Sequence, residues 1–173
     1  AQELDPLSLI IAADIAGYYY ITRQFDKAIE QSLKMIEMDE NFGYGYVFLW
    51  ISYEQKGNFD EATKALIKVE SLFLPPEMIR QNQKAYEKDG WKGYWQVKYK
   101  QTTQPPTNLY FSNYQRAMTA YRIDDLEATF QWLQKSGEAK ERWFVNLKYD
   151  PEWDKIRSDA RFNELIRKAN LIP

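Results

Sequence analysis

Acidic side chains at alternate positions near the C-terminus are the first candidates for chemistry. Asp150, Glu152 and Asp154 alternate as the first ligands of a calcium-binding loop do. Such a loop then needs a glycine and a distal glutamate, and Lys155 and Arg161 stand at those positions instead. We therefore expect no metal here. Asp150 is predicted to cap a helix, with acids favoured in the first turn by the helix dipole.

A second candidate is a run in which lysines alternate with aromatic residues. The lysines are Lys88, Lys92, Lys98 and Lys100, and the aromatic residues are Trp91, Tyr94, Trp95 and Tyr99. Basic residues beside stacking aromatics can bind single-stranded nucleic acid. The aromatics, however, fall on one face of a helix, and lysine stems normally flank such a face. We favour the amphipathic helix and keep one alternative, a small-molecule pocket lined by Trp91, Trp95 and Tyr99.

The composition removes most other chemistry. The 173 residues contain no His and no Cys, so the commonest general base, the commonest transition-metal ligand and any thiolate are missing. No glycine-rich phosphate-binding motif and no nucleophile-elbow motif occurs. The net charge of −2 favours neither nucleic acid nor an anionic membrane, and no apolar run approaches the about 18 residues of a membrane span. We expect a single non-enzymatic domain without cofactor, nucleic-acid partner or membrane partner.

The elements that position these residues are organised by a repeat. Residues Tyr19, Phe25, Ala28, Ile29 and Met38 recur 34 residues later as Tyr53, Phe59, Ala62, Thr63 and Leu72. Apolar residues at three- and four-residue steps predict helices over 8–22, 26–38, 41–56 and 60–72. The sequence therefore predicts two consecutive helical hairpins.

This repeat resembles the tetratricopeptide (TPR) family, whose hairpins recur every 34 residues. The tyrosine, aromatic and alanine positions match best, and Gly57-Asn58-Phe59-Asp60 is similar to the turn between the two helices of a TPR hairpin. The resemblance implies an all-α fold in which antiparallel helix pairs stack into a right-handed superhelix. The alternative is an ordinary helical bundle with chance spacing.

The rest of the chain departs from the 34-residue register. We expect one domain over 1–173, with hairpins at 8–40 and 42–74, an irregular helix pair at 76–100 broken by Gly90, and a polar, proline-bearing linker at 101–107. A degenerate third hairpin is expected at 112–136, capped by Ser112, and a helical cap at 138–173. The last helix, starting at Ser158 and Asp159, should bury Phe162, Leu165, Ile166 and Ala169.

The C-terminal part carries a second resemblance. Asp150-Pro151-Glu152-Trp153-Asp154 and Ile156-Arg157-Ser158-Asp159-Ala160-Arg161-Phe162 are similar to the ending of a group of bacterial TPR regions, although Trp153, Ile156 and Ala160 depart from it. Such regions usually follow winged-helix transcription regulators, nucleotide cyclases or kinases. Leu4-Asp5-Pro6 also looks like the end of an earlier TPR hairpin. The resemblance implies the C-terminal part of a bacterial regulatory or signalling protein, expected in the cytoplasm, or in the periplasm if a membrane helix lies upstream.

The TPR resemblance also implies where a partner would bind, because the first helix of each hairpin lines the concave face in that family. The matching positions are Ile10, Ala13, Asp14, Gly17, Tyr20 and Ile21 in the first hairpin, and Tyr44, Val47, Phe48, Ile51, Glu54 and Gln55 in the second. Several of these residues are large and apolar, as in many interaction sites. The alternative is that the chain's own segments, 91–99 or 143–147, cover that face.

We therefore expect a non-catalytic module that binds a protein or peptide segment, or a neighbouring domain of the parent chain. Two further hypotheses stay open: a homodimerisation module, and the small-molecule sensor of a transcription regulator. Ala13, Gly17 and Phe48 stand where some TPR domains carry the Lys and Asn that bind acidic chaperone tails, so binding of such a tail is not expected.

Overall fold

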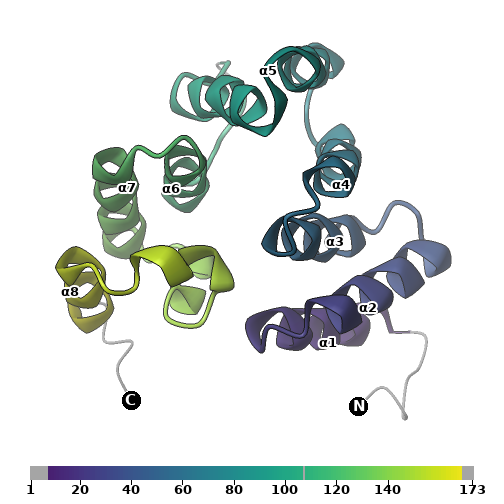
Figure 1. Ribbon diagram of the computed structural model, residues 1–173, viewed down its shortest axis with the longest axis horizontal. Coiled ribbons are helices and arrows are strands. Elements are labelled where there is room, and N and C mark those ends of the chain that lie inside the picture. The colour runs from purple at the N-terminus through teal and green to yellow at the C-terminus, as the bar shows by residue number, and fades with distance from the viewer. Residues whose placement is uncertain (1–7, 107, 169–173) are drawn as a thin grey trace. The chain divides into compact units, whose positions relative to one another are not determined.

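The structure is a computed structural model that describes residues 8–106 and 108–168. Within those ranges every regular element is a helix, no strand occurs, and helices adjacent in sequence pack as pairs (Figure 1). The chain divides into two compact units, unit 1 up to Ile79 and unit 2 from Arg80. No helix in the described ranges is both long enough and apolar enough to cross a membrane.

Unit 1 contains the two predicted hairpins. The helices are α1 (Leu9–Ile21), α2 (Phe25–Met38), α3 (Gly43–Gln55) and α4 (Phe59–Ser71). Their bounds lie within two residues of those predicted, and α3 starts and ends 34 residues after α1. Ser8 caps α1 by accepting a hydrogen bond from the Ile11 amide, as Asn58 caps α4 through the Glu61 amide.

The turns inside the three hairpins share one backbone conformation. Arg23, Gly57 and Asp124 have φ values of 60°, 74° and 64°, the left-handed conformation that ends many helices. In each case the amide of the next residue reaches back to a carbonyl of the preceding helix, at Tyr19, Tyr53 and Ala120 respectively. Only the second turn uses the glycine that this conformation favours.

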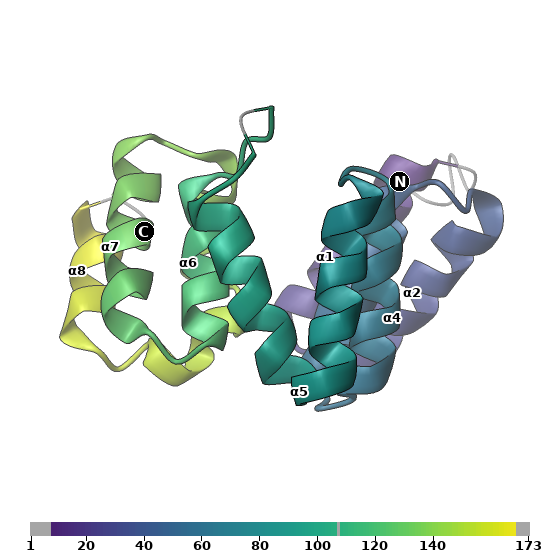
Figure 2. The same ribbon diagram turned by 90° about the horizontal axis from the view of Figure 1, so that it is seen from above.

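The helix α5 (Pro76–Thr103) starts in unit 1 and continues into unit 2. Unit 2 also contains α6 (Asn113–Arg122), α7 (Leu126–Glu138) and α8 (Ala160–Lys168). Two 3₁₀ helices, η1 (Arg142–Asn146) and η2 (Pro151–Ile156), connect α7 to α8. The α6–α7 pair lies side by side in both views, and α8 lies beside α7 (Figures 1 and 2). Ser112 and Gln115 form a capping box at the start of α6.

The predicted break at Gly90 is confirmed, because this residue has φ 63° and ψ −154° within α5. The predicted linker at 101–107 was wrong over its first part, since α5 continues through Thr103. Gln101 and Thr102 are buried, and the Thr102 and Thr119 hydroxyls share a hydrogen bond of 3.1 Å. Packing of Thr102 against α6 therefore extends the helix into a segment whose polar composition predicted a linker. Residue 107 lies outside the described residues.

The core of unit 2 forms around Trp153, which is buried in contact with α6 residues. Phe162, Leu165 and Ile166 of α8 are buried as predicted, whereas Ala169, like Leu4, Asp5 and Pro6, lies outside the described residues. The last helix starts at Ala160, just after the predicted Ser158 and Asp159.

Glu141 links the two ends of the α6–α7 pair. Its carboxylate accepts hydrogen bonds of 2.8 Å from the amides of Asn113 and Tyr114, the first residues of α6. The Ser136 hydroxyl of α7 donates a third bond to the same carboxylate. A negative charge at a helix N-terminus satisfies amides that no carbonyl reaches and is favoured by the helix dipole.

Candidate interaction surface of unit 1

The predicted partner-binding positions of α1 and α3 meet at Gly17 and Phe48. A Cβ atom at Gly17 would lie 3.1 Å from Cζ of Phe48. A glycine at this point therefore lets the Phe48 ring lie against the α1 backbone. The structure thus brings the first helices of the two hairpins into contact, and the binding of a partner there stays a prediction.

Aromatic rings continue from this contact along α3. The ring of Tyr44 stacks with that of Phe48 at a centroid distance of 6.4 Å, and Phe42 lies 5.8 Å from Tyr44. All three are half-buried and pack against a small core of Ala12, Ala13, Ala16 and Met35. These rings therefore contribute to the core of unit 1 and remain partly exposed.

Burial divides the predicted surface into two sets. Tyr20 and Ile51 are only 5% and 9% exposed, and Ala13 is also buried, so these three side chains contribute to the core rather than to an accessible surface. Ile10 is 60% exposed and Asp14 is exposed. The remaining predicted positions are half-buried: Gly17, Ile21, Tyr44, Val47, Phe48, Glu54 and Gln55. We call the accessible set, Ile10, Asp14, Gly17, Tyr44, Val47, Phe48 and Glu54, the α1–α3 face.

The charged groups of the α1–α3 face are both acidic. The Asp14 side chain makes no hydrogen bond or ion pair with the described residues, and its carboxylate stands one helical turn from the exposed Ile10. Glu54 lies at the far end of α3 and is half-buried. An apolar surface bordered by carboxylates suits a segment that combines apolar and basic side chains.

A shallow depression next to the hairpin turns was not predicted from the sequence. It has a volume of about 250 Å³ and is lined by Arg23, Gln24, Phe25, Asp26, Lys27 and Lys56. Lys56 pairs with Asp26, and Lys27 donates a hydrogen bond of 2.8 Å to the Gln24 amide oxygen. Three cations around one carboxylate make this area basic. The only signal in the sequence was the placement of Arg23 and Lys56 at the two turns.

The aromatic residues of α5 share one helix face, as the spacing predicted. Trp91 stacks with Tyr94 at 6.1 Å and meets Trp95 edge-on at 5.4 Å. The guanidinium of Arg122 lies 4.5 Å from the centroid of the Trp95 ring. Tyr94 and Trp95 are buried, so other residues already cover their ring surfaces. Tyr99, the third residue of the hypothetical pocket, is half-buried and makes no ring contact with the others.

The acids of the calcium-like pattern have protein partners instead. Asp150 caps η2 by accepting from the Glu152 amide, which confirms the predicted cap. Glu152 forms an ion pair with Arg122, and Asp154 forms one with Arg157, each at 2.6 Å. Their geometry is that of helix capping and ion pairing within unit 2.

Tyr114 connects this region to the core. Its hydroxyl donates a hydrogen bond of 3.0 Å to Oδ2 of Asp150 and accepts one of 2.9 Å from Nε1 of Trp153. Burial, followed by the nearby charge of Asp150, raises the pKa of the Tyr114 phenol well above its usual value. The phenol therefore stays neutral and donates to the carboxylate. Sequence reasoning missed this contact because the two residues lie 36 positions apart.

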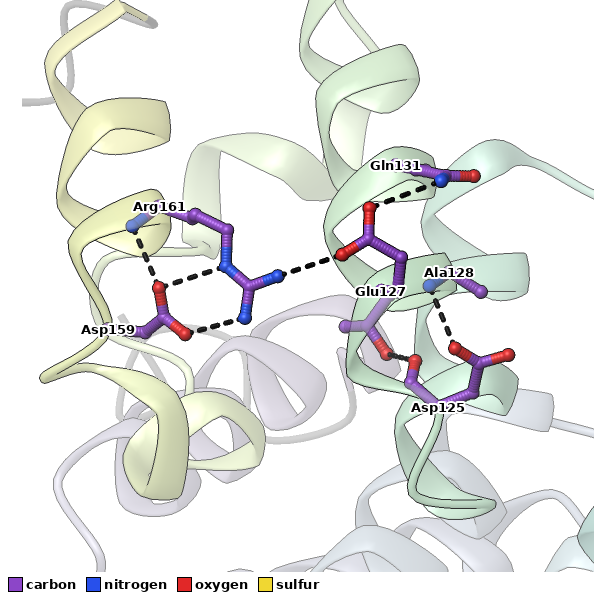
Figure 3. A network of polar contacts seen from close by, with 7 residues as sticks. Asp125, Glu127, Ala128, Gln131, Asp159 and Arg161 are labelled. Carbon is purple, nitrogen blue, oxygen red and sulfur yellow. Dashed lines mark hydrogen bonds and ion pairs between the residues drawn. The ribbon is translucent and has the colours of Figure 1, made fainter.

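A polar network at the surface joins α7 to α8 (Figure 3). Arg161 pairs with Asp159 at 2.8 Å and with Glu127 at 3.2 Å, and its guanidinium lies 4.0 Å from the centroid of the Phe130 ring. The hydrogen bond from Arg161 lowers the pKa of the Asp159 carboxyl. These exposed side chains pair with one another and link the start of α8 to α7.

In comparisons with family models, with curated proteins and with solved structures, nothing matched this chain.

Proposed function

We propose that this chain is a non-catalytic protein–protein interaction module that binds a peptide segment, or a neighbouring domain, on the α1–α3 face of unit 1. The setting we propose is the one that the resemblance implies, a bacterial regulatory or signalling protein such as a transcription regulator. The observation that carries the proposal is the Phe48–Gly17 contact, because it joins α1 and α3 into one apolar, half-exposed surface. Stacking of the hairpins as a TPR superhelix is part of the same proposal.

The chemistry of the face indicates the kind of partner. Tyr44 and Phe48 offer ring edges, and Ile10 offers an exposed aliphatic side chain at one end. Aromatic residues dominate the energetics of many interfaces because they bury a large area at a small cost in side-chain entropy. A segment with one apolar anchor next to a Lys or Arg would pair its cation with Asp14.

The test is a selection of binding peptides from a random library on the intact chain, followed by calorimetric titration of the selected peptides. Ile10→Glu should weaken binding at least about tenfold, because it places a charge on the exposed end of the face. Val145→Glu is the matched control, since Val145 is equally exposed in unit 2 and lies outside the face. Equal binding by the wild type and the Ile10→Glu variant would contradict the proposal.

The two other hypotheses predict different results. Homodimerisation predicts a dimer mass by light scattering at micromolar concentration, with no need for a peptide. A small-molecule sensor would have to admit its ligand among Trp91, Trp95 and Tyr99, where Trp95 is buried beneath Arg122. Among the residues of unit 2 that the structure describes, no contact favours this last hypothesis over the α1–α3 face.

A further inference from the structure

The 34-residue repeat makes the surroundings of α1 and α3 directly comparable. Three α3 residues stand at i, i+4 and i+7, so they share one stripe of the helix, and all three are buried: Gly45, Leu49 and Ser52, the last of them 0% exposed. The contact with the preceding hairpin is close, because a Cβ atom at Gly45 would lie 2.8 Å from Cγ1 of Ile36 in α2. This side of α3 is therefore a surface on which a helical hairpin already packs.

The residues of α1 at the equivalent positions are Ile11, Ile15 and Tyr18. They stand at i, i+4 and i+7, so they form one stripe along the helix. Tyr18 is 61% exposed, and Ile11 and Ile15 are half-buried. We call this stripe the α1 edge. It is apolar at all three positions, although the described residues leave it partly open to solvent.

We propose that the α1 edge is the docking surface for a further helical hairpin, packed on α1 as α1 and α2 pack on α3. The first argument is continuity, because the α1 edge repeats, one period earlier, the interface that holds the two hairpins of unit 1 together. The second argument is that stacked hairpins bury their apolar faces only against neighbours. None of the three α1-edge residues belongs to the α1–α3 face, although a docked hairpin would also cover Asp14 of that face, and the proposal does not depend on peptide binding there.

Size complementarity specifies part of the occupant. Ile36 of α2 fits against α3 because residue 45 is a glycine. The residue of α1 equivalent to Gly45 is Ile11, whose side chain occupies the position that is left empty at Gly45 in α3. The docking hairpin should therefore carry a small residue, such as alanine, where α2 carries Ile36. An isoleucine there would overpack the contact.

Charge complementarity specifies a second position. Asp14 is the α1 equivalent of Phe48, and Phe48 lies against Gly17 of the preceding hairpin. A docked hairpin would thus cover Asp14 with the residue that corresponds to Gly17. Since Asp14 makes no ion pair with the described residues, covering it requires a cation. The occupant should carry Lys or Arg at that position.

The experiment adds such a hairpin to the chain. A duplicate of residues 8–41 is joined directly ahead of Ser8, in place of residues 1–7, so that the 34-residue period is kept. The duplicate alone carries Gly17→Lys and Ile36→Ala. We expect the midpoint of thermal unfolding to rise by about 5 °C or more, and hydrogen exchange in α1 to slow at least about tenfold.

The matched control places Tyr18→Glu in the original copy of α1. In the unextended chain this exposed substitution should leave the midpoint unchanged, whereas in the extended chain it should abolish the gain. A gain that survives Tyr18→Glu, or no gain at all, overturns the proposal. An extended chain without the two changes in the duplicate should gain less, and an equal gain would refute the stated chemistry of the occupant. A Tyr18-dependent dimer of the unextended chain would assign the α1 edge to a second copy and overturn the proposal.

Discussion

Arg122 and Glu152 form an ion pair of 2.6 Å in which both side chains are almost fully buried, 3% and 4% exposed. Arg122 also donates to the Met118 carbonyl and covers the Trp95 ring, so one guanidinium joins α5, α6 and η2. Removal of one partner from a buried pair leaves an uncompensated charge in a region of low dielectric. Loss of either partner from this pair should therefore destabilise unit 2.

We predict that Glu152→Gln lowers the free energy of unfolding by about 3–5 kcal/mol. Urea unfolding followed by tryptophan fluorescence measures this change. The matched control is Glu30→Gln, which breaks the exposed pair between Glu30 and Lys34 on α2 and should cause no measurable loss. If the two variants unfold at the same urea concentration, the Arg122–Glu152 pair does not stabilise unit 2.

Tyr114 predicts a specific dependence of stability on alkaline pH. The folded state raises the pKa of its phenol, so its contribution is complete below the unfolded pKa of about 10. As the pH rises above that value, the unfolded phenol ionises first. The free energy of unfolding should then fall by about 1.4 kcal/mol per pH unit from this group alone.

The Tyr114→Phe variant tests this contribution. It keeps the ring contact with Trp153 and removes the titrating group, so its stability should decline less steeply than that of the wild type above pH 10. At pH 7 it should be less stable by about 1–3 kcal/mol, because Asp150 and Trp153 each lose a hydrogen-bond partner. Parallel alkaline slopes in the two proteins would show that another group controls the transition.

Two buried serines in unit 1 should respond oppositely to the same substitution. The Ser32 hydroxyl donates to the Ala28 carbonyl at 2.7 Å, whereas the Ser52 hydroxyl has no hydrogen-bond partner among the described residues. A buried hydroxyl without a partner costs about 1–3 kcal/mol. We therefore expect Ser52→Ala to raise the free energy of unfolding by about 1 kcal/mol and Ser32→Ala to lower it by a similar amount. Chemical denaturation of the two variants side by side decides the matter, and a loss of stability in Ser52→Ala would mean that its hydroxyl has a partner.

Gly17 should tolerate no large side chain while Phe48 is present. Gly17→Leu would push the Phe48 ring away from α1 and destabilise unit 1 by about 1–3 kcal/mol. Phe48→Ala leaves a space that the new leucine can enter, so the double variant should be more stable than the sum of the single effects predicts. A double-mutant cycle measures this coupling, and additive effects would place the two residues out of contact.

The helices of unit 1 could be predicted because their signals are local. Ser8 and Asn58 are N-caps, and the 34-residue period places α3 from α1. The extension of α5 through Thr103 could not be predicted in this way, since Gln101 and Thr102 are polar and become buried only through contacts with distant residues.

The binding role of the candidate surface stays a prediction, and the exposure of its residues was predictable only in part. The TPR resemblance placed Gly17 and Phe48 on one face, and the structure brings these two residues into contact. The resemblance could not show that Tyr20 and Ile51 turn toward the core, because helical spacing alone does not say how far a neighbouring helix covers a face. The contacts of Glu141 and Tyr114 were also out of reach, since each joins residues far apart in the sequence.

The position of Glu141 has a consequence for how unit 2 assembles. Its carboxylate becomes available to the first amides of α6 only after α7 has folded back and the chain has turned at Lys140. An isolated α6 would leave those amides to water. The first turn of α6 is therefore stabilised by a residue that follows α7, so the stability of α6 depends on α7 being folded beside it.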